Sequence, residues 1–161
     1  MATLIQSSLV EVLRSRFRLD WKGIHGASHW ARVRQNGLVL AERLGPAVDV
    51  KVVELFAFLH DSCRHDDGHD PMHGARAAES ILELAEDLPS LSDEERKLLA
   101  YACTHHSDGL LRADPTVQVC WDADRLDLGR VGYRPDPERL CTPVARDSAL
   151  IHWAYERSTR G

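Results

Sequence analysis

Leu55-Phe56-Ala57-Phe58-Leu59-His60-Asp61 is an apolar helical run that ends in two adjacent ionisable residues, and it decides the fold. Val53, Ala57 and His60 recur at helical spacing, so His60 continues the buried stripe of this helix. Burying an imidazole and a carboxylate without partners costs several kcal/mol. A divalent metal ion satisfies both groups, because neutral imidazole nitrogen and carboxylate oxygen are good metal ligands. For this pair alone, a hydrogen-bonded core histidine beside a helix-terminal aspartate is the alternative.

The length and composition predict an ordinary globular protein. The chain has 161 residues, and we expect a single domain over 1–161. The net charge of −5 without a basic run argues against a nucleic-acid polymer as partner. We find no membrane-span length of apolar sequence, no signal-peptide pattern and no Cys-x-x-Cys pair among the four cysteines. We therefore expect a cytoplasmic protein with reduced thiols and no membrane partner, and homo-oligomer formation stays open.

Helix signals fill the chain, and no β-alternation of useful length interrupts them. Capping residues or proline pairs that begin helices stand at Ser28, Asp49, Ser92 with Glu95, Asp114-Pro115, Asp136-Pro137 and Thr142-Pro143. Two further helices are expected over residues 4–17 and 72–88. The predicted fold class is an all-α bundle, with a motif core at about 25–130 and C-terminal helices packing on it.

Ionisable side chains interrupt the apolar faces of five predicted helices, at His29, His60, His73, His106 and Asp124. One such residue is usually a satisfied core polar group, but five are costly unless they converge on something shared. Histidine and aspartate are ligand types that a divalent ion selects, and open coordination positions are typical of catalytic centres. We therefore predict a metal centre. His105 follows Leu98 and Ala102 at helical spacing almost as well as His106 follows Leu99, so His105 stays a second candidate.

The order of these residues resembles a known family signature. His29 … His60-Asp61 … Asp124 is similar to the signature of the HD-domain superfamily of metal-dependent phosphohydrolases. The residues around each position also resemble the motifs of this superfamily. They are His29-Trp30-Ala31-Arg32-Val33, Leu59-His60-Asp61 and the closing stretch Asp122-Ala123-Asp124-Arg125-Leu126-Asp127. His73-Gly74-Ala75 and His105-His106 resemble the extra motifs of members that hold two metals. The resemblance runs from about His29 to Leu128, most of the chain.

The resemblance implies a helical bundle in which His29, His60, Asp61 and Asp124 hold one divalent ion. Asp61 would share a second ion with His73 and either His105 or His106. The sequence does not distinguish Mn, Fe, Co, Ni, Zn or Mg. The implied reaction is hydrolysis of a phosphoester bond in a small phosphorylated substrate, such as a nucleotide, by metal-activated water.

Asp61 is the predicted catalytic carboxylate, and cations near it would contact the phosphate, with candidates at Arg64, Arg76, Arg125 and Arg130. A surface or structural role is the alternative for each arginine, and for Arg125 this is an ion pair with Asp124 or Asp127. Arg64 stands where some nucleotidase-like members place a glutamate. The paired acids that follow His-Asp in guanosine-tetraphosphate hydrolases are absent, which disfavours that substrate.

Two other functions remain open at this stage. One branch of the superfamily uses the same ligand order to hold a mixed-valent di-iron centre and acts as an oxygenase. A non-catalytic module that binds a metal or a ligand is the other alternative. His25, His65 and His69 lie in predicted loops and are ambiguous or more typical of exposed residues than of ligands.

Overall fold

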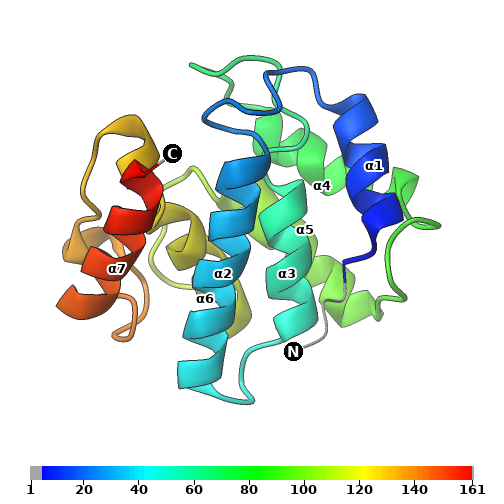
Figure 1. The fold of residues 1–161 in the computed structure, drawn as a ribbon. Coiled ribbons are helices and arrows are strands. Elements are labelled where there is room, and N and C mark those ends of the chain that lie inside the picture. Colours follow the sequence, from blue (N-terminus) through cyan, green and yellow to red (C-terminus); the bar gives the residue numbers. More distant parts are fainter. Residues whose placement is uncertain (1–4, 161) are drawn as a thin grey trace.

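The computed structural model describes residues 5–160, and within that range all regular secondary structure is helical (Figure 1). The all-α prediction is therefore confirmed. The described residues form seven α-helices and two short 3-10 helices: α1 Ser7–Arg16, α2 Ala27–Leu44, α3 Val50–Leu59, α4 His73–Glu83, α5 Asp93–His105, α6 Pro115–Arg125, η1 Leu128–Val131, η2 Pro137–Arg139 and α7 Ser148–Thr159. The predicted first helix began at Leu4, which lies outside the described residues.

The apolar helix α3 forms the centre of the bundle. Val52, Leu55, Phe56 and Leu59 are fully buried on one face, and Val53, Glu54 and Ala57 on the other faces are buried too, so most of the circumference of the helix is covered. α2, α5 and α6 provide the cover, and α4 packs on the outer side of α5. Figure 1 shows α2 and α3 side by side in the middle, with α7 on one flank and α1 on the other. Because α3 is buried, His60 at its C-terminal end lies in the interior of the bundle.

Four predicted helix starts are confirmed by their cap geometry, and one of them, Asp136-Pro137, begins the short 3-10 helix η2. The Asp49 side chain accepts a hydrogen bond from Val52 N and caps α3. Ser92 and Glu95 form the reciprocal capping box at the start of α5. Asp114 caps α6, with proline at its first position.

Two predicted helix starts and one predicted end are wrong. α2 begins one residue before Ser28, because the tight turn preceding it places Gly26 where a Cβ would lie 2.1 Å from the Trp21 carbonyl oxygen. The last helix begins at Ser148 and not at Thr142-Pro143, because Thr142 is held by the buried carboxylate of Asp122. The helix predicted over 72–88 ends at Glu83, and the chain continues beyond it as turns.

A glycine sets the spacing between α4 and α5. A Cβ added at Gly74 would lie 2.4 Å from the carbonyl oxygen of Cys103 and 2.9 Å from that of Thr104. Only glycine permits this approach of one helix to the other backbone. The contact brings His73, the first residue of α4, against His106, which ends α5.

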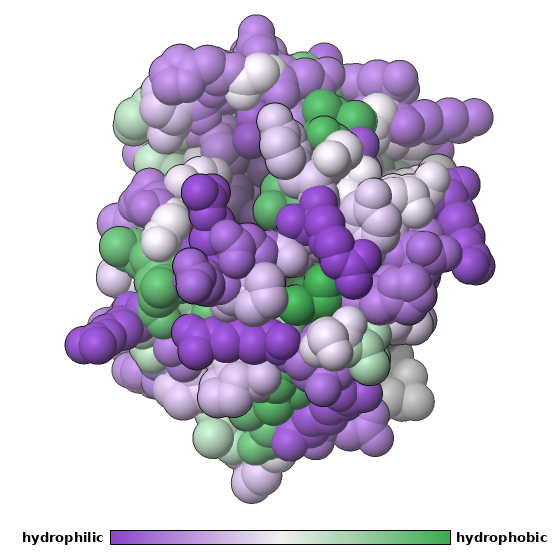
Figure 2. Space-filling view, turned by 90° about the vertical axis from the view of Figure 1, so that its left-hand side faces the viewer, coloured by the Kyte–Doolittle hydropathy of each residue, from purple (hydrophilic) through white to green (hydrophobic). Residues whose placement is uncertain are grey.

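The surface on the α7 side is largely hydrophilic. Figure 2 shows hydrophobic residues on this face only in small groups between polar side chains. Within residues 5–160, no helix is both long enough and apolar enough to cross a membrane.

Candidate metal centre

The predicted ligands gather at one end of the bundle, each at or near a helix terminus. His29 lies in the first turn of α2 and His73 starts α4, whereas His60 and His106 end α3 and α5. Asp61 follows His60 directly, and these five residues are at most 5% exposed. Asp124, in the last turn of α6, has a side chain that is 16% exposed. Six polar groups from five helices are thus brought into one largely buried cluster.

The cluster consists of two groups that share the carboxylate of Asp61. Its Oδ2 lies 3.3 Å from Nε2 of both His29 and His60, and its Oδ1 lies 3.4 Å from Nε2 of both His73 and His106. Within the groups, the Nε2 atoms are 3.0 Å apart for His29 and His60 and 2.8 Å apart for His73 and His106. Each oxygen of Asp61 therefore faces one histidine pair.

Asp124 belongs to the first group alone. Its Oδ1 lies 3.2 Å from Nε2 of His29 and 3.5 Å from Nε2 of His60. Donor atoms about 2.1 Å from one ion lie about 3.0–3.4 Å apart in octahedral or tetrahedral coordination. The spacings in the two groups, 2.8–3.5 Å, lie within about 0.2 Å of that range, so each group has the dimensions of a metal site.

The other nitrogen of each imidazole is bound to the protein. Nδ1 of His60 donates to the carbonyl oxygens of Phe56 and Ala57, that of His106 to Cys103 O, and that of His73 to Asp70 O. A carbonyl oxygen only accepts, so Nδ1 carries a proton, and it is the Nε2 proton that a metal would displace. Loss of that proton leaves the Nε2 lone pair available, as in protein metal sites where an oxygen orients the histidine ligand.

The electrostatics of the cluster favour a positive charge within it. Burial by itself lowers the pKa of His60, but the carboxylates of Asp61 and Asp124 outweigh burial and raise this pKa to about 10. Burial by itself raises the pKa of Asp61, yet His60, His106 and His29 hold it well below its ordinary value. Burial likewise raises the pKa of Asp124, but His29 and His60 hold it well below its ordinary value, so the two carboxylates stay charged and attract cations. Two groups of buried side chains could each hold a metal ion. One is His29, His60 and Asp61, and the other is Asp61, His73 and His106, so Asp61 belongs to both.

Asp127 is a part of the centre that the sequence reasoning missed. Its fully buried carboxylate accepts a hydrogen bond from His29 Nδ1 at 2.7 Å and one from Arg32 Nε at 2.7 Å. Asp127 therefore orients His29 in the way that backbone carbonyls orient the other three imidazoles. Its position three residues after Asp124 is the signal that would have found it, since residues at this spacing share a helix face.

The structure separates His105 from the cluster and corrects its inclusion among the candidate ligands. Its Nδ1 lies 2.6 Å from a carboxylate oxygen of Asp108, and its ring lies against Tyr101. Adjacent residues on a helix point about 100° apart, so only one of His105 and His106 faces inward.

The three loop histidines also lie outside the cluster. His65 and His69 are exposed. His25 is buried, but its Nδ1 lies 2.7 Å from Asp67, and this contact joins the loop before α2 to the loop before α4.

The four candidate arginines have different surroundings. Arg76 forms an ion pair with Asp70 and donates to Cys63 O, which is a structural role. Arg125 does not pair with Asp124 or Asp127, because Arg32 takes Asp127 and Arg125 turns toward residues 139–141. Arg64 and Arg130 lie beside the cluster, and both line the cavity onto which it opens.

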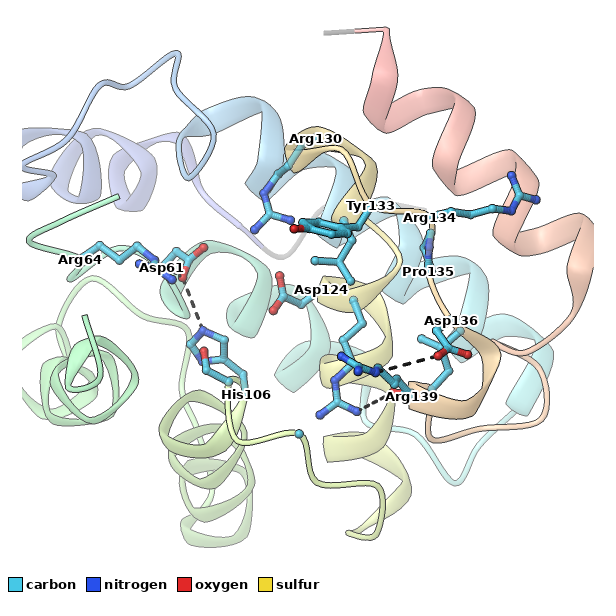
Figure 3. A pocket seen from close by; sticks show the side chains of 15 residues that line it. Asp61, Arg64, His106, Asp124, Arg130, Tyr133, Arg134, Pro135, Asp136 and Arg139 are labelled. Atoms are coloured by element: carbon cyan, nitrogen blue, oxygen red, sulfur yellow. Dashed lines mark hydrogen bonds and ion pairs between the residues drawn. The ribbon is translucent and has the colours of Figure 1, made fainter. Parts of the chain in front are cut away.

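This cavity of about 740 Å³ contains three groups of the centre, Asp61, His106 and Asp124, in its wall. Its other charged lining residues are Arg64, Arg125, Arg130, Arg134, Asp136 and Arg139. Figure 3 shows Arg64 and Arg130 near Asp61, with Arg139 and Asp136 beyond Asp124; the Arg134 side chain runs away from the cavity. The guanidinium of Arg134 instead lies over the ring of Tyr155. A cleft of this volume suits a small molecule, and its cations favour an anionic one.

No protein-family model, curated protein or solved structure matches the chain. The helical fold and the buried His/Asp cluster are compatible with an HD-like metal site.

Proposed function

We propose that this protein is an HD-type phosphohydrolase that cleaves a phosphoester bond in a small phosphorylated substrate such as a nucleotide. The observation that carries the proposal is a His/Asp centre at one end of a cleft that guanidinium groups line. A phosphate bound in the cleft beside the centre would lie between the guanidinium groups of the wall and the metal ions of the centre. Stabilising the charge on phosphate oxygens is the main task in phosphoryl transfer.

The proposed ligand sets follow from the distances. His29, His60, Asp61 and Asp124 would hold one divalent ion, and Asp61, His73 and His106 a second. When bound, such ions supply a water of lowered pKa and neutralise charge on the phosphate and on the leaving oxygen. Asp61 supports two sites better than one, because both of its oxygens face a histidine pair.

Arg64 would orient the phosphate beside the centre. Its Nε donates to Asp61 Oδ1 at 3.1 Å, and its Nη1 donates to the carbonyl oxygens of Asp66 and Gly68. These bonds fix the guanidinium on the cavity wall and leave Nη2 for a phosphate oxygen. A planar guanidinium held in this way suits the geometry of phosphate better than a flexible lysine.

Arg130 would neutralise the phosphate from the opposite side. Its Nε donates to Ile24 O and its Nη1 to Asp127 O, and both acceptors are neutral carbonyl groups. Because these bonds position the side chain without cancelling its charge, the positive charge of Arg130 remains available to an anion in the cleft.

The test measures metal content and phosphate release together. The purified protein is stripped with a chelator and reloaded with Mn, Fe, Co, Ni, Zn or Mg. Hydrolysis is then assayed with a panel of phosphate monoesters, diesters and nucleotides, under air and under argon, as inorganic phosphate from monoesters and as the monoester product from diesters. We expect hydrolysis that needs no oxygen and that rises up to two equivalents of metal.

Two aspartate variants give the matched comparison. Asp61→Ala should abolish activity and lower metal content, whereas Asp93→Ala, on the exposed start of α5, should change neither. Absence of hydrolysis with every metal and substrate, measured as phosphate or as monoester product, would overturn the proposal. Turnover only with iron and oxygen would favour the oxygenase, and metal binding without turnover the non-catalytic module.

A further inference from the structure

The wall of the cleft beyond Asp124 contains an unsatisfied cationic group. Nη2 of Arg125 is the one buried side-chain nitrogen or oxygen within residues 5–160 that has no hydrogen-bond partner. Shielding a charged donor atom from water without giving it an acceptor is unfavourable. Such a group calls for an explanation, and a ligand that supplies the missing acceptor is one.

The remaining contacts of Arg125 hold its guanidinium in place without neutralising it. Nη1 donates to Arg139 O at 3.0 Å and to Cys141 Sγ at 3.4 Å, and the guanidinium lies over the Trp121 ring. Burial raises the pKa of Cys141 to about 12, so the thiol is neutral. The charge of Arg125 is therefore fixed beside the cleft and has no carboxylate partner among these contacts.

Arg139 adds a second arginine to the wall of the same cavity. Its backbone carbonyl accepts from Arg125, and its side chain is 85% exposed. The nearest carboxylate oxygen, of Asp136, is 3.9 Å from Arg139 Nε, too far for a hydrogen bond. Figure 3 shows Arg139 on the other side of Asp124 from Asp61 and His106.

We propose that Arg125 and Arg139 form a second anion subsite, so that the substrate is a phosphate ester with a second anionic group, a phosphate or a carboxylate, away from the scissile bond. This inference rests on the proposed function and narrows its substrate class. The scissile phosphate lies at the His/Asp centre, and the second anion pairs with the two guanidinium groups. Nη2 of Arg125 is closed to solvent, so its pairing with the anion requires a neighbouring surface side chain to shift.

The first test compares substrates in matched pairs that differ by one anionic group. Glycerol 3-phosphate is compared with 3-phosphoglycerate, and a nucleoside 5′-monophosphate with its 3′,5′-bisphosphate. We expect kcat/KM to be about 10–150-fold higher for the doubly anionic member, the range that one hydrogen bond to a charged group provides. Hydrolysis of both members at equal efficiency would overturn the subsite and leave the proposed function standing.

The second test uses variants. Arg139 is exposed, so Arg139→Gln should leave the core intact. In this variant the preference within each pair should fall about 10-fold or more, and Arg139→Lys should restore part of it. Arg96→Gln, on the exposed face of α5, is the control and should keep the wild-type preference. An unchanged preference in Arg139→Gln would contradict the assignment.

The third test needs no turnover and so stays decisive if no substrate is hydrolysed. Inorganic phosphate is titrated into the metal-stripped full-length chain by calorimetry, and the arginine Nε–H resonances are followed by NMR. We expect saturable binding that shifts the Arg125 resonance and weakens about 10-fold or more in Arg139→Gln. Equal binding by the wild type and Arg139→Gln, or none by either, would overturn the subsite.

Discussion

The role of Asp127 can be tested by replacing it with asparagine. The amide has the shape of the carboxylate, but its NH₂ group cannot accept a hydrogen bond. Asp127 now accepts from both His29 Nδ1 and Arg32 Nε at 2.7 Å. In Asp127→Asn, at least one of these donors loses its acceptor, and the charge of Arg32 loses its buried partner.

Two magnitudes follow from these contacts. Loss of an oxygen that orients a histidine ligand typically lowers metal affinity about 10–100-fold, which corresponds to about 1.4–2.7 kcal/mol. Breaking a buried ion pair costs about 3–5 kcal/mol of folding stability. The Arg32 side chain is 14% exposed and keeps some contact with water, so we expect the lower end, about 3 kcal/mol.

The assay separates the two effects with a matched control. Metal affinity is measured by competition with a chromogenic chelator, and stability by urea unfolding of the metal-stripped protein. Asp122→Asn alters another buried aspartate of the same stretch, which accepts from the backbone of Cys141 and Thr142 and contacts no candidate ligand. It should lose stability at unchanged metal affinity. Wild-type metal affinity in Asp127→Asn would refute the orienting role.

Four further predictions concern the two halves of the centre. Gly74→Ala places a Cβ 2.4 Å from Cys103 O, so we expect α4 to move off α5, a loss of about 1–3 kcal/mol of stability, and elemental analysis showing one equivalent of metal fewer. His106→Ala should also remove one equivalent, whereas His105→Ala should bind as much metal as the wild type; equal losses would contradict the inward orientation of His106 alone. The pKa of His60 rises from 6.5 to about 10, so this group stabilises the metal-free fold fully below pH 6.5, and urea unfolding should show that stability declining as pH rises toward 10. Metal must displace this proton, so calorimetry in two buffers of different ionisation enthalpy should detect proton release near neutral pH.

Much of the fold was predictable because its signals are local. Asp49, the Ser92–Glu95 capping box and Asp114-Pro115 mark helix starts through contacts within one turn, and all three are confirmed. The start of α2 was missed because a tight turn, not a side-chain cap, sets it. The start of α7 was missed because Asp122, twenty residues earlier, holds Thr142.

The sequence by itself determined which side chains enter the core. Helical periodicity specifies the face on which a residue lies, so it predicted that His29, His60, His73, His106 and Asp124 would point inward. Whether they bind metal stays a prediction. Periodicity did not decide between His105 and His106, because both follow apolar residues at nearly the same spacing.

Only the tertiary structure decided how these side chains meet. Contacts between helices place the two oxygens of Asp61 against different histidine pairs, join Asp127 to His29 across 98 positions, and leave Nη2 of Arg125 without a partner. Each of these facts depends on distances between residues far apart in the chain. A helical pattern fixes a direction around one axis, whereas a metal site or an anion subsite requires donor atoms from several axes to coincide within a few tenths of an ångström. That coincidence is set by packing details such as Gly74, which lets α4 approach the backbone of α5.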